Sequence, residues 1–207
     1  TYGSPRKTEI SLEMGGIDIG DLIAKEEVVI SMTHLGYIKR MALTEYKSQN
    51  RGGVGVTAHK TKEEDFVDQI FTTNTHDDLL FFTTKGKVYT IKAYEVPEAQ
   101  RTAKGRAVVN LIQVDADEKV SAVVQRKEGA EGYLVMATKN GLVKRTALSE
   151  FDSIRKSGKI AISLTKDDEL IGAALTNGEQ DILVAASNGK CIRFPETDVR
   201  MTGRESQ

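Results

Sequence analysis

Cysteine and long apolar segments are nearly missing from this sequence, and each absence excludes a class of protein. The single cysteine, Cys191, rules out an intrachain disulfide, so the composition favours a reducing compartment over the secreted environment of many disulfide-bonded β proteins. Cys191 lies in a strand-like stretch, which favours a structural thiol over a nucleophile. Even the longest apolar runs, such as residues 182–186, are far below the roughly 20 residues that cross a bilayer. We therefore expect a cytoplasmic protein without a membrane-spanning helix.

A large excess of charge of either sign is also absent, because 29 basic residues face 30 acidic ones. A net charge of −1 argues against a uniformly basic nucleic-acid binder. The charges are nevertheless segregated. Residues 85–106 and 139–159 each hold six basic residues against two acidic ones, whereas acids gather at 63–65, 115–118 and 167–169. This segregation predicts a strongly positive face, and the alternative is that both basic stretches are solvated loops.

Four segments of the sequence align with one another and place a glycine at the same point of a predicted hairpin turn. The turn glycines are Gly36, Gly86, Gly141 and Gly189, separated by 50, 55 and 48 residues. Asparagine precedes two of them, as a tight type I′ hairpin favours because its central residues adopt positive φ. A period near 50 residues is typical of propeller blades of about four strands. The sequence therefore predicts an all-β, propeller-like fold of repeated four-stranded units.

Apolar patterns locate strands inside these units. Residues 79–82 are continuously apolar, which predicts a central strand buried on both faces, and the alternation at 88–91 predicts a half-exposed strand. Helix signals are weak: a short helix is expected within 19–27, and a turn at 94–100 that Pro97 interrupts. Two successive three-stranded meanders are expected, one from 120–126, 133–138 and 142–146, and the next from 170–175, 182–187 and 190–194.

A second glycine with an arginine before it follows the turn glycine in three of the units. Gly55 and Gly105 each follow their turn glycine by 19 residues, and Gly158 follows its own by 17. Glycine lets the backbone bend and approach another surface closely, and a guanidinium suits a phosphate. These loops predict a nucleic-acid surface around the rim of the fold. The residues concerned are Arg51, Arg101 and Arg155, with Arg200, Gly203 and Arg204 in the fourth unit.

The glycine-rich segment Gln49-Asn50-Arg51-Gly52-Gly53-Val54-Gly55 carries the most specific resemblance to a known family. The C-terminal domain of the DNA gyrase A subunit has a box of the pattern Gln-basic-Arg-Gly-Gly-basic-Gly in its first blade, which this segment resembles at five of seven positions. Asn50 and Val54 replace the two basic positions. The resemblance covers nearly the whole chain, because segments 23–31, 34–40, 94–97, 101–105 and 193–200 are also similar to the family.

The resemblance implies a six-bladed β-pinwheel whose blades exchange strands. This chain is expected to supply about four of the six blades. Residues 1–27 are expected to be a linker from the cleavage-religation half of the gyrase A protein, and residues 28–207 the DNA-wrapping domain. The blades are expected at roughly 28–62, 63–115, 116–166 and 167–207.

The resemblance also implies a function. The family's disc wraps double-stranded DNA without sequence choice and supports ATP-dependent negative supercoiling by a holoenzyme of two A and two B subunits. The box at 49–55 is expected to contact DNA or to latch the first blade to the last. The alternatives are the paralogous topoisomerase IV subunit, whose domain usually lacks an intact box, and a protein-interaction propeller. Further DNA contacts are expected from rim cations, namely Lys39, Arg40, Lys85, Lys87, Arg101, Lys104, Arg106, Lys139, Lys144, Arg145, Lys156 and Lys159.

No catalytic or metal-binding site is expected in this chain alone. The three histidines, His34, His59 and His76, lack metal-ligand spacing, and His34 and His76 are expected in turns. The sequence has no phosphate-binding P-loop or acyl-transfer elbow, and none of its six tyrosines stands out as a DNA-cleaving nucleophile. The resemblance places the cleavage tyrosine in the N-terminal half of the gyrase A protein, and it assigns ATP and magnesium to other domains of the holoenzyme.

Overall fold

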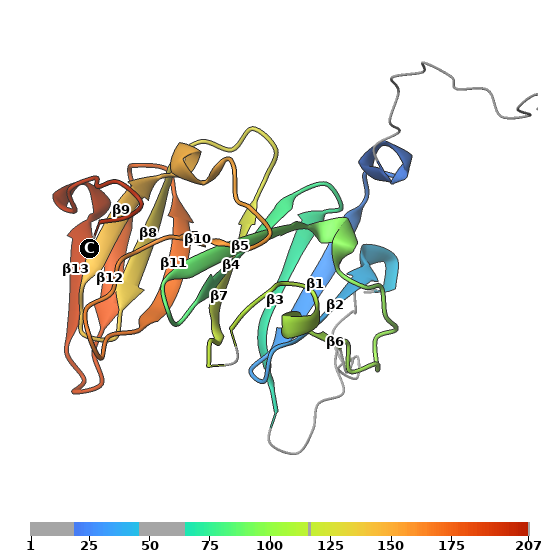
Figure 1. The fold of residues 1–207 in the computed structure, drawn as a ribbon, viewed down its shortest axis with the longest axis horizontal. Coiled ribbons are helices and arrows are strands. Elements are labelled where there is room, and N and C mark those ends of the chain that lie inside the picture. The colour runs from blue at the N-terminus through green and yellow to red at the C-terminus, as the bar shows by residue number, and fades with distance from the viewer. Residues whose placement is uncertain (1–18, 46–64, 116, 207) are drawn as a thin grey trace, which may run out of the picture.

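Four antiparallel sheets stand side by side in the computed structural model, which describes residues 19–45, 65–115 and 117–206 (Figure 1). The first sheet has the order β3-β1-β2-β6, the second β10-β5-β4-β7, the third β11-β8-β9, and the fourth pairs β12 with β13. The strands are β1 (Glu27–Thr33), β2 (Tyr37–Ala42), β3 (Val67–Asn74), β4 (Asp78–Thr83), β5 (Lys87–Lys92), β6 (Arg106–Ala107), β7 (Val120–Arg126), β8 (Tyr133–Thr138), β9 (Val143–Ala147), β10 (Lys159–Ile160), β11 (Leu170–Thr176), β12 (Asp181–Ala185) and β13 (Cys191–Pro195).

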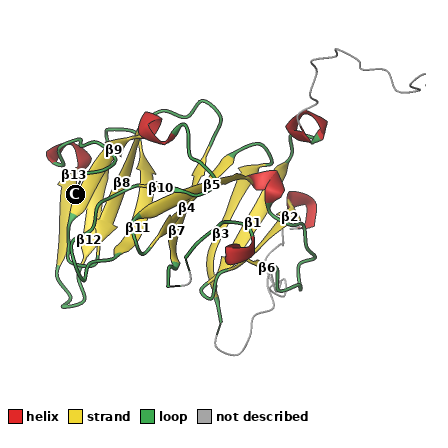
Figure 2. Ribbon diagram, in the orientation of Figure 1, coloured by secondary structure: helices red, strands yellow, loops and turns green. Residues whose placement is uncertain are grey.

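Helical structure in the described residues is limited to short 3-10 turns (Figure 2). The all-β prediction is therefore confirmed. No helix in this part of the chain combines the length and apolar character that crossing a bilayer would need. The 3-10 turns are η1 (Ile19–Leu22), η2 (Leu43–Glu45), η3 (Ala93–Glu95), η4 (Val108–Asn110), η5 (Leu148–Phe151) and η6 (Glu196–Asp198).

Each sheet is built on a hairpin whose turn ends at a glycine with positive φ. Gly36, Gly86, Gly141 and Gly189 have φ of 80°, 74°, 87° and 79°, in the left-handed region that favours glycine. In the first three hairpins, a threonine at the start of the turn supports the geometry. In the first hairpin, the hydroxyl oxygen of Thr33 accepts a hydrogen bond of 3.1 Å from the backbone N–H of Tyr37. The four hairpin turns predicted from the sequence are thus confirmed. The type I′ geometry expected at the Asn-Gly turns is not, because it needs positive φ at both central residues and neither Asn140 nor Asn188 has positive φ.

The central strand β4 belongs to two cores at once. Leu79 and Phe81 lie in a core with residues of β1, whereas Leu80 and Phe82 lie in a second core with residues of β8. All four side chains are at most 1% exposed, as the continuously apolar pattern predicts. Successive strand residues face opposite sides of a sheet, so an apolar run lets one strand hold two neighbouring sheets together. Burying one such side chain contributes about 1.5–3 kcal/mol.

Two local predictions need correction. The strand β5 is more buried than its alternation predicts, because Val88, Tyr89 and Ile91 are all buried and Thr90 is half-buried. The helix expected within 19–27 is reduced to the single 3-10 turn η1, and Glu27 already opens β1. The helix is short because the residues from Glu27 onward belong to β1, which pairs with both β2 and β3.

The predicted meanders also need correction, because strands cross from one unit to the sheet before it. The strand β7 pairs with β4 and not with β8, and β11 pairs with β8 and not with β12. In the same way β3 pairs with β1. Each of these strands opens one of the blade ranges expected from the sequence, so strand pairing carries the opening strand of each range into the preceding sheet. The ranges themselves stay a prediction.

A second segment of each unit also crosses to the preceding sheet, and we call these segments the exchange loops, residues 96–107, 152–161 and 199–206. The first ends in β6, which pairs with β2, and the second contains β10, which pairs with β5. In the third, the backbone N–H of Thr202 donates to the carbonyl of Arg145 at 2.9 Å. The exchange loops therefore cover the same edge of three successive hairpins.

Candidate nucleic-acid interface

The first exchange loop is held from below by a lysine that lies inside the sheet. Lys39 is fully buried in β2. Its ammonium group donates to the carbonyl oxygens of Gln100 at 3.2 Å and Ala103 at 2.9 Å, and also to that of Arg101. A buried ammonium group is costly unless it is hydrogen-bonded, and here the loop backbone supplies the acceptors. The loop carbonyls therefore turn inward, toward the sheet.

The third exchange loop repeats this arrangement two units later. Lys144 in β9 is 2% exposed and donates to the carbonyls of Arg204 at 2.6 Å, Ser206 at 2.7 Å and Ala161 at 3.1 Å. Burial, together with the nearby positive charge of Arg204, lowers the pKa of Lys144 to about 8. Lys39 and Lys144 were expected to contact DNA on the rim, but the structure places both inside the protein as loop anchors.

The middle exchange loop packs on an aromatic ring in place of a lysine. Tyr89 occupies the position of Lys39 and Lys144, and Gly158 lies so close that an added Cβ would be 2.7 Å from the ring. Gly105 of the first loop is equally confined, since its Cβ would lie 2.5 Å from the carbonyl oxygen of Ile38. Both glycines have positive φ. Gly105 and Gly158 are therefore required for their loops to lie flat on the sheet, whereas Gly203 of the third exchange loop has nothing within 4 Å of an added Cβ.

Most of the cations on the exchange loops have no acidic partner within the described residues. The first two exchange loops, 96–107 and 152–161, each contain three basic residues and one acid, and the third, 199–206, contains two basic residues and one acid. The three acids are themselves paired, Glu98 with Arg40 at 3.5 Å, Asp152 with Arg126, and Glu205 with Arg204 at 2.9 Å. Lys104 lies over the ring of Tyr37, with its nitrogen 3.7 Å from the ring centre. Six loop cations form no ion pair with an acidic side chain in the part of the chain that the structure describes, namely Arg101, Arg106, Arg155, Lys156, Lys159 and Arg200.

The cations of the second and third hairpin turns, in contrast, are paired with acids. Lys85 contacts Asp117 at 2.5 Å, and Lys87 contacts Asp115 at 2.8 Å. The hydrogen bond to Asp115 raises the pKa of Lys87, and the same bond lowers the pKa of the Asp115 carboxyl. Lys139 pairs more loosely, at 3.8 Å from Glu169. These three lysines were expected on the rim, yet their charges are offset by the acidic links between the sheets.

Two arginines expected on the rim are largely occupied inside the fold. The Nε of Arg40 donates to the carbonyl of Val96 at 3.1 Å. The guanidinium of Arg145 lies 4.8 Å from the centre of the Tyr133 ring and 3.8 Å from the buried carboxylate of Glu196, and its side chain is 12% exposed. Both arginines thus join a hairpin to the unit that follows it. Their neighbours in the exchange loops are the better candidates for contact with a ligand.

Repeated hairpins, exchanged strands and a basic loop along one edge together define a recognisable family. The sequence model of the DNA gyrase C-terminal domain, described as a beta-propeller, matches residues 27–74, 77–125, 132–177 and 180–207. The chain belongs to this family. The match confirms the resemblance to the C-terminal domain of the DNA gyrase A protein that the sequence motifs indicated.

Similar proteins agree with this assignment. The chain is 52% identical to the DNA gyrase A protein of Clostridium acetobutylicum over 99% of its own length, and 50% identical to that of Staphylococcus aureus over 98%. It covers 25% and 23% of those two proteins, so it spans about a quarter of the curated relatives it matches.

Solved structures show the same architecture. A topoisomerase IV C-terminal domain superposes with a TM-score of 0.73 at 29% identity, covering 89% of this chain and 56% of that one. A DNA gyrase A C-terminal domain gives a TM-score of 0.68 at 28% identity, covering 88% and 59%. The backbone alone therefore does not separate the two paralogues, whereas the sequence identities of about 50% are to DNA gyrase A proteins.

The gyrase-like box falls outside the described residues. The predictions for Gln49, Asn50, Arg51, Gly52, Gly53, Val54 and Gly55, as DNA contacts or as a latch, therefore stay predictions. What the structure adds is the behaviour of the related glycines. Gly105 follows its turn glycine by the same interval as Gly55, and it lies against the preceding hairpin.

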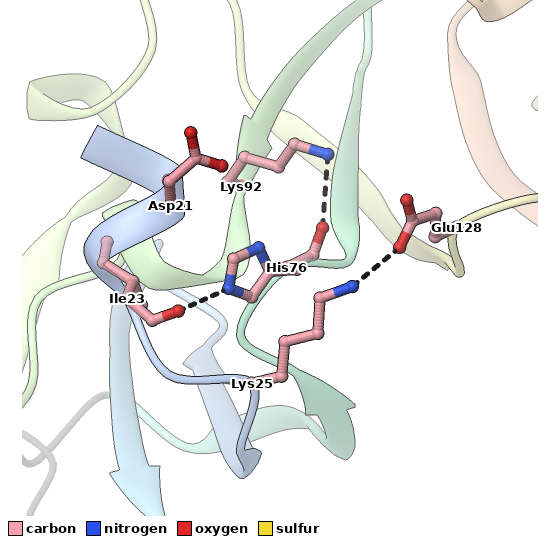
Figure 3. Close-up of a pocket in the computed structure, with 7 residues that line it drawn as sticks. Asp21, Ile23, Lys25, His76, Lys92 and Glu128 are labelled. Carbon is pink, nitrogen blue, oxygen red and sulfur yellow. Dashed lines mark hydrogen bonds and ion pairs between the residues drawn. The ribbon is translucent and has the colours of Figure 1, made fainter. Parts of the chain in front are cut away.

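The chain that leads into the first sheet forms a separate polar cavity of about 400 Å³ with two turns of the fold (Figure 3). Its cations are already engaged. Lys25 pairs with Glu128 at 3.2 Å, and a ring nitrogen of His76 is hydrogen-bonded to the carbonyl of Ile23 at 2.8 Å. Lys92 likewise donates to the carbonyl of His76. The contacts of these lining residues hold the leading segment against the first two sheets, and they leave few free charges for a ligand.

Buried carboxylates that support the hairpin turns are structural features that the sequence analysis missed. Glu118 accepts hydrogen bonds from the hydroxyls of Thr83 and Tyr89, and Asp168 accepts from the backbone N–H of Asn140 at 2.9 Å. The acidic clusters at 115–118 and 167–169 were recognised only as surface charge. One signal was available: each cluster follows its turn glycine at a similar interval of about 30 residues.

Histidine and cysteine form no metal site in the part of the chain that the structure covers. No group of three or more His, Cys, Asp or Glu side chains is placed there to hold a metal ion. His34 and His76 lie in turns as expected, and Cys191 is exposed on β13.

Proposed function

We propose that this chain binds double-stranded DNA without sequence choice and bends it along the row of exchange loops. The observation that carries the proposal is the set of loop cations without acidic partners among the described residues, beside turn lysines whose charge is offset. Phosphate contacts give affinity and position but no sequence information, as this role requires. At the second and third turns, Asp115, Asp117 and Glu169 pair with lysines, and Glu118 and Asp168 are buried.

The energetics require the charge to be spread over several sheets. Bending 20–30 base pairs by 40–90° costs on the order of 1–6 kcal/mol, so one or two arginines cannot offset it. Exchange loops on three successive hairpins provide repeated contacts along a path. The box at 49–55 is proposed to extend this path or to latch the first blade to the last.

Within a larger enzyme, this module would deliver wrapped DNA for strand passage and so support ATP-dependent negative supercoiling. The proposed partners are double-stranded DNA, the gyrase B subunits and a second copy of the gyrase A protein, with the protein partners reached through other domains. We propose that the chain alone is not a catalyst and needs no cofactor, with ATP and magnesium handled elsewhere in the holoenzyme. The proposed compartment is the bacterial cytoplasm.

A salt titration tests the proposal. Binding of the chain to a short DNA duplex would be measured by mobility shift between 50 and 200 mM salt. Each phosphate contact contributes about −0.9 to the slope of log K against log salt, so several engaged loop cations predict a slope of about −4 or steeper. A protein-interaction propeller would bind the duplex weakly at all salt concentrations, and that outcome would overturn the proposal.

Wrapping is tested separately from affinity by ligating a nicked circle in the presence of the chain. A wrapped path changes the linking number of the closed product, whereas simple binding does not. Replacing Arg51, Gly52 and Gly53 with alanine is expected to reduce the linking change more than the affinity, because the other loops still hold phosphates. An unchanged linking number with a normally folded variant would remove the box from the proposal.

A further inference from the structure

Two lysines of this fold occupy equivalent positions and do the same thing. Lys39 and Lys144 each stand three residues after a turn glycine, Gly36 and Gly141. Both are buried, and both direct the ammonium group at main-chain carbonyls of the exchange loop that crosses from the following unit. Sequence separations of 60 or more residues lie between each lysine and the loop that it holds.

The bonds to each ammonium group fix the shape of a loop and not only its position. Lys39 reaches the carbonyls of residues 100, 101 and 103. Three carbonyls so close in sequence can converge on one nitrogen only if the backbone curls around it. Around these carbonyls stand the three loop cations: Arg106 is exposed, Arg101 and Lys104 are half-buried, and Lys104 lies over the ring of Tyr37.

We infer that Lys39 and Lys144 are positioning residues, which hold the exchange loops in the shape that presents the loop cations to DNA. The inference rests on the proposed DNA-binding function, but the clamp itself can be measured without DNA. It assigns to the two lysines a role different from the direct phosphate contact that the sequence predicts. Their ammonium groups bind the loop backbone, and the cationic side chains of the loops contact the DNA.

The middle unit provides an internal contrast. Tyr89 stands at the equivalent position and donates its hydroxyl to Glu118 at 3.2 Å, not to the loop. The second exchange loop is fixed instead by β10 and by two backbone N–H groups, of Ala161 and Ile162, that donate to the carbonyl of Gly86. The first exchange loop has comparable backbone pairing, through β6 and through the bonds of Arg40 to residues 97 and 99, so Lys39 adds to this pairing and does not replace it. Removing the Tyr89 hydroxyl should leave its loop in place.

Hydrogen exchange of the loop amides tests the clamp. Lys39→Met and Lys144→Met keep an unbranched side chain of similar length and remove the ammonium donors. In Lys39→Met, the amide of Ala99, which donates to the carbonyl of Arg40, and the amide of Ala103, which donates to that of Gln100, should exchange at least tenfold faster. In Lys144→Met the same is expected of Thr202 and Ser206. Each variant should leave the other loop unchanged, and Tyr89→Phe should leave residues 155–161 unchanged.

The salt dependence of DNA binding separates a clamp from a direct contact. If Lys39 touched one phosphate, Lys39→Met would reduce the slope of log K against log salt by about 0.9. If it presents the cations of the first exchange loop, the reduction should be about 2–3, although only one charge is removed. Arg106→Ala is the matched control, with an expected reduction of about 0.9 and no change in loop exchange.

Unchanged loop exchange in a folded Lys39→Met or Lys144→Met variant would overturn the inference. Faster exchange together with a slope change of one contact or less would also overturn it, because the loop would then be clamped for another reason. Since the two lysines hold separate loops, one variant decides if the other fails to fold. Absence of DNA binding by the unmodified chain would instead refute the proposed function, while the exchange result would still decide the clamp.

Discussion

The exchange loops and the hairpin turns of this protein are both rich in lysine and arginine, yet only the loops keep their charge available. In the second and third hairpins, the turn lysines meet the carboxylates of Asp115, Asp117 and Glu169. The loops contain few acids, and most of their cations meet none among the described residues. Net charge therefore says little about where such a protein can bind an anion. The placement of the acids decides it, and here they neutralise the turns and leave one edge positive.

The largest expected loss of stability comes from replacing a glycine of an exchange loop, and a glycine of a hairpin turn provides the comparison. Gly105 in a loop and Gly141 in a turn both have positive φ, which costs about 1–2 kcal/mol for other residues. At Gly105 an added Cβ would also overlap the carbonyl of Ile38, whereas at Gly141 nothing lies within 4 Å. Overpacking of this kind adds about 1–3 kcal/mol. Urea denaturation should therefore show Gly105→Ala losing about 2–5 kcal/mol, and Gly141→Ala about 1–2 kcal/mol.

Raising the pH is expected to change the stability of the protein through Lys144, which holds the third exchange loop. Because burial and Arg204 hold the pKa of Lys144 at about 8, below its ordinary value of 10.5, the native state releases this proton first. Between these pH values the unfolded state binds more protons, so the free energy of unfolding should rise with pH. The rise from this group is at most about 3 kcal/mol relative to Lys144→Met. Unfolding free energies of both proteins at pH 7 and pH 10 would check it, and parallel pH profiles would contradict it.

Acid is expected to act on the turn side in the opposite sense. Burial acts to raise the pKa of Asp168, but hydrogen bonds from Thr138 and from the amides of Asn140 and Glu169, with the charge of Lys139, outweigh it and lower the pKa. The stabilisation is therefore complete above the ordinary pKa of 3.8 and is lost as the pH falls through the lower native value. Asp168→Asn should be less stable than the unmodified chain at pH 7, and the difference should shrink below pH 3.8. A difference independent of pH would contradict this.

The smallest effect is expected from the exposed ion pairs of the turns. Lys85→Ala breaks the contact with Asp117, but exposed pairs contribute little because water and salt screen them. The denaturation midpoint should stay within measurement error, and adding 0.5 M salt should not change that result. A clear loss of stability would mean that the turn pairs hold the fold together, and the contrast between turns and loops would need revision.

The sequence predicts where strands lie better than it predicts which strands pair with one another, and the reason is physical. The strand at 120–126 was predicted with the bounds that β7 has, because apolar alternation is a local signal. Its partner was predicted wrongly, since nothing within the strand distinguishes β8, which follows it, from β4, which precedes it. Lys39 and Lys85 show the same limit at the site. Both lie within three residues of a turn glycine, but Lys39 is buried by a loop about 60 residues away and Lys85 is exposed.

Matched triple variants give the most direct test of the central claim, that the loops and not the turns hold DNA. One variant replaces Arg155, Lys156 and Lys159 with alanine, and the other replaces Lys85, Lys87 and Lys139, so each loses three charges. We predict that the loop variant reduces the slope of log K against log salt by about 2–3, while the turn variant changes it by less than about 1. An equal loss in both variants, or a larger loss in the turn variant, would contradict this claim.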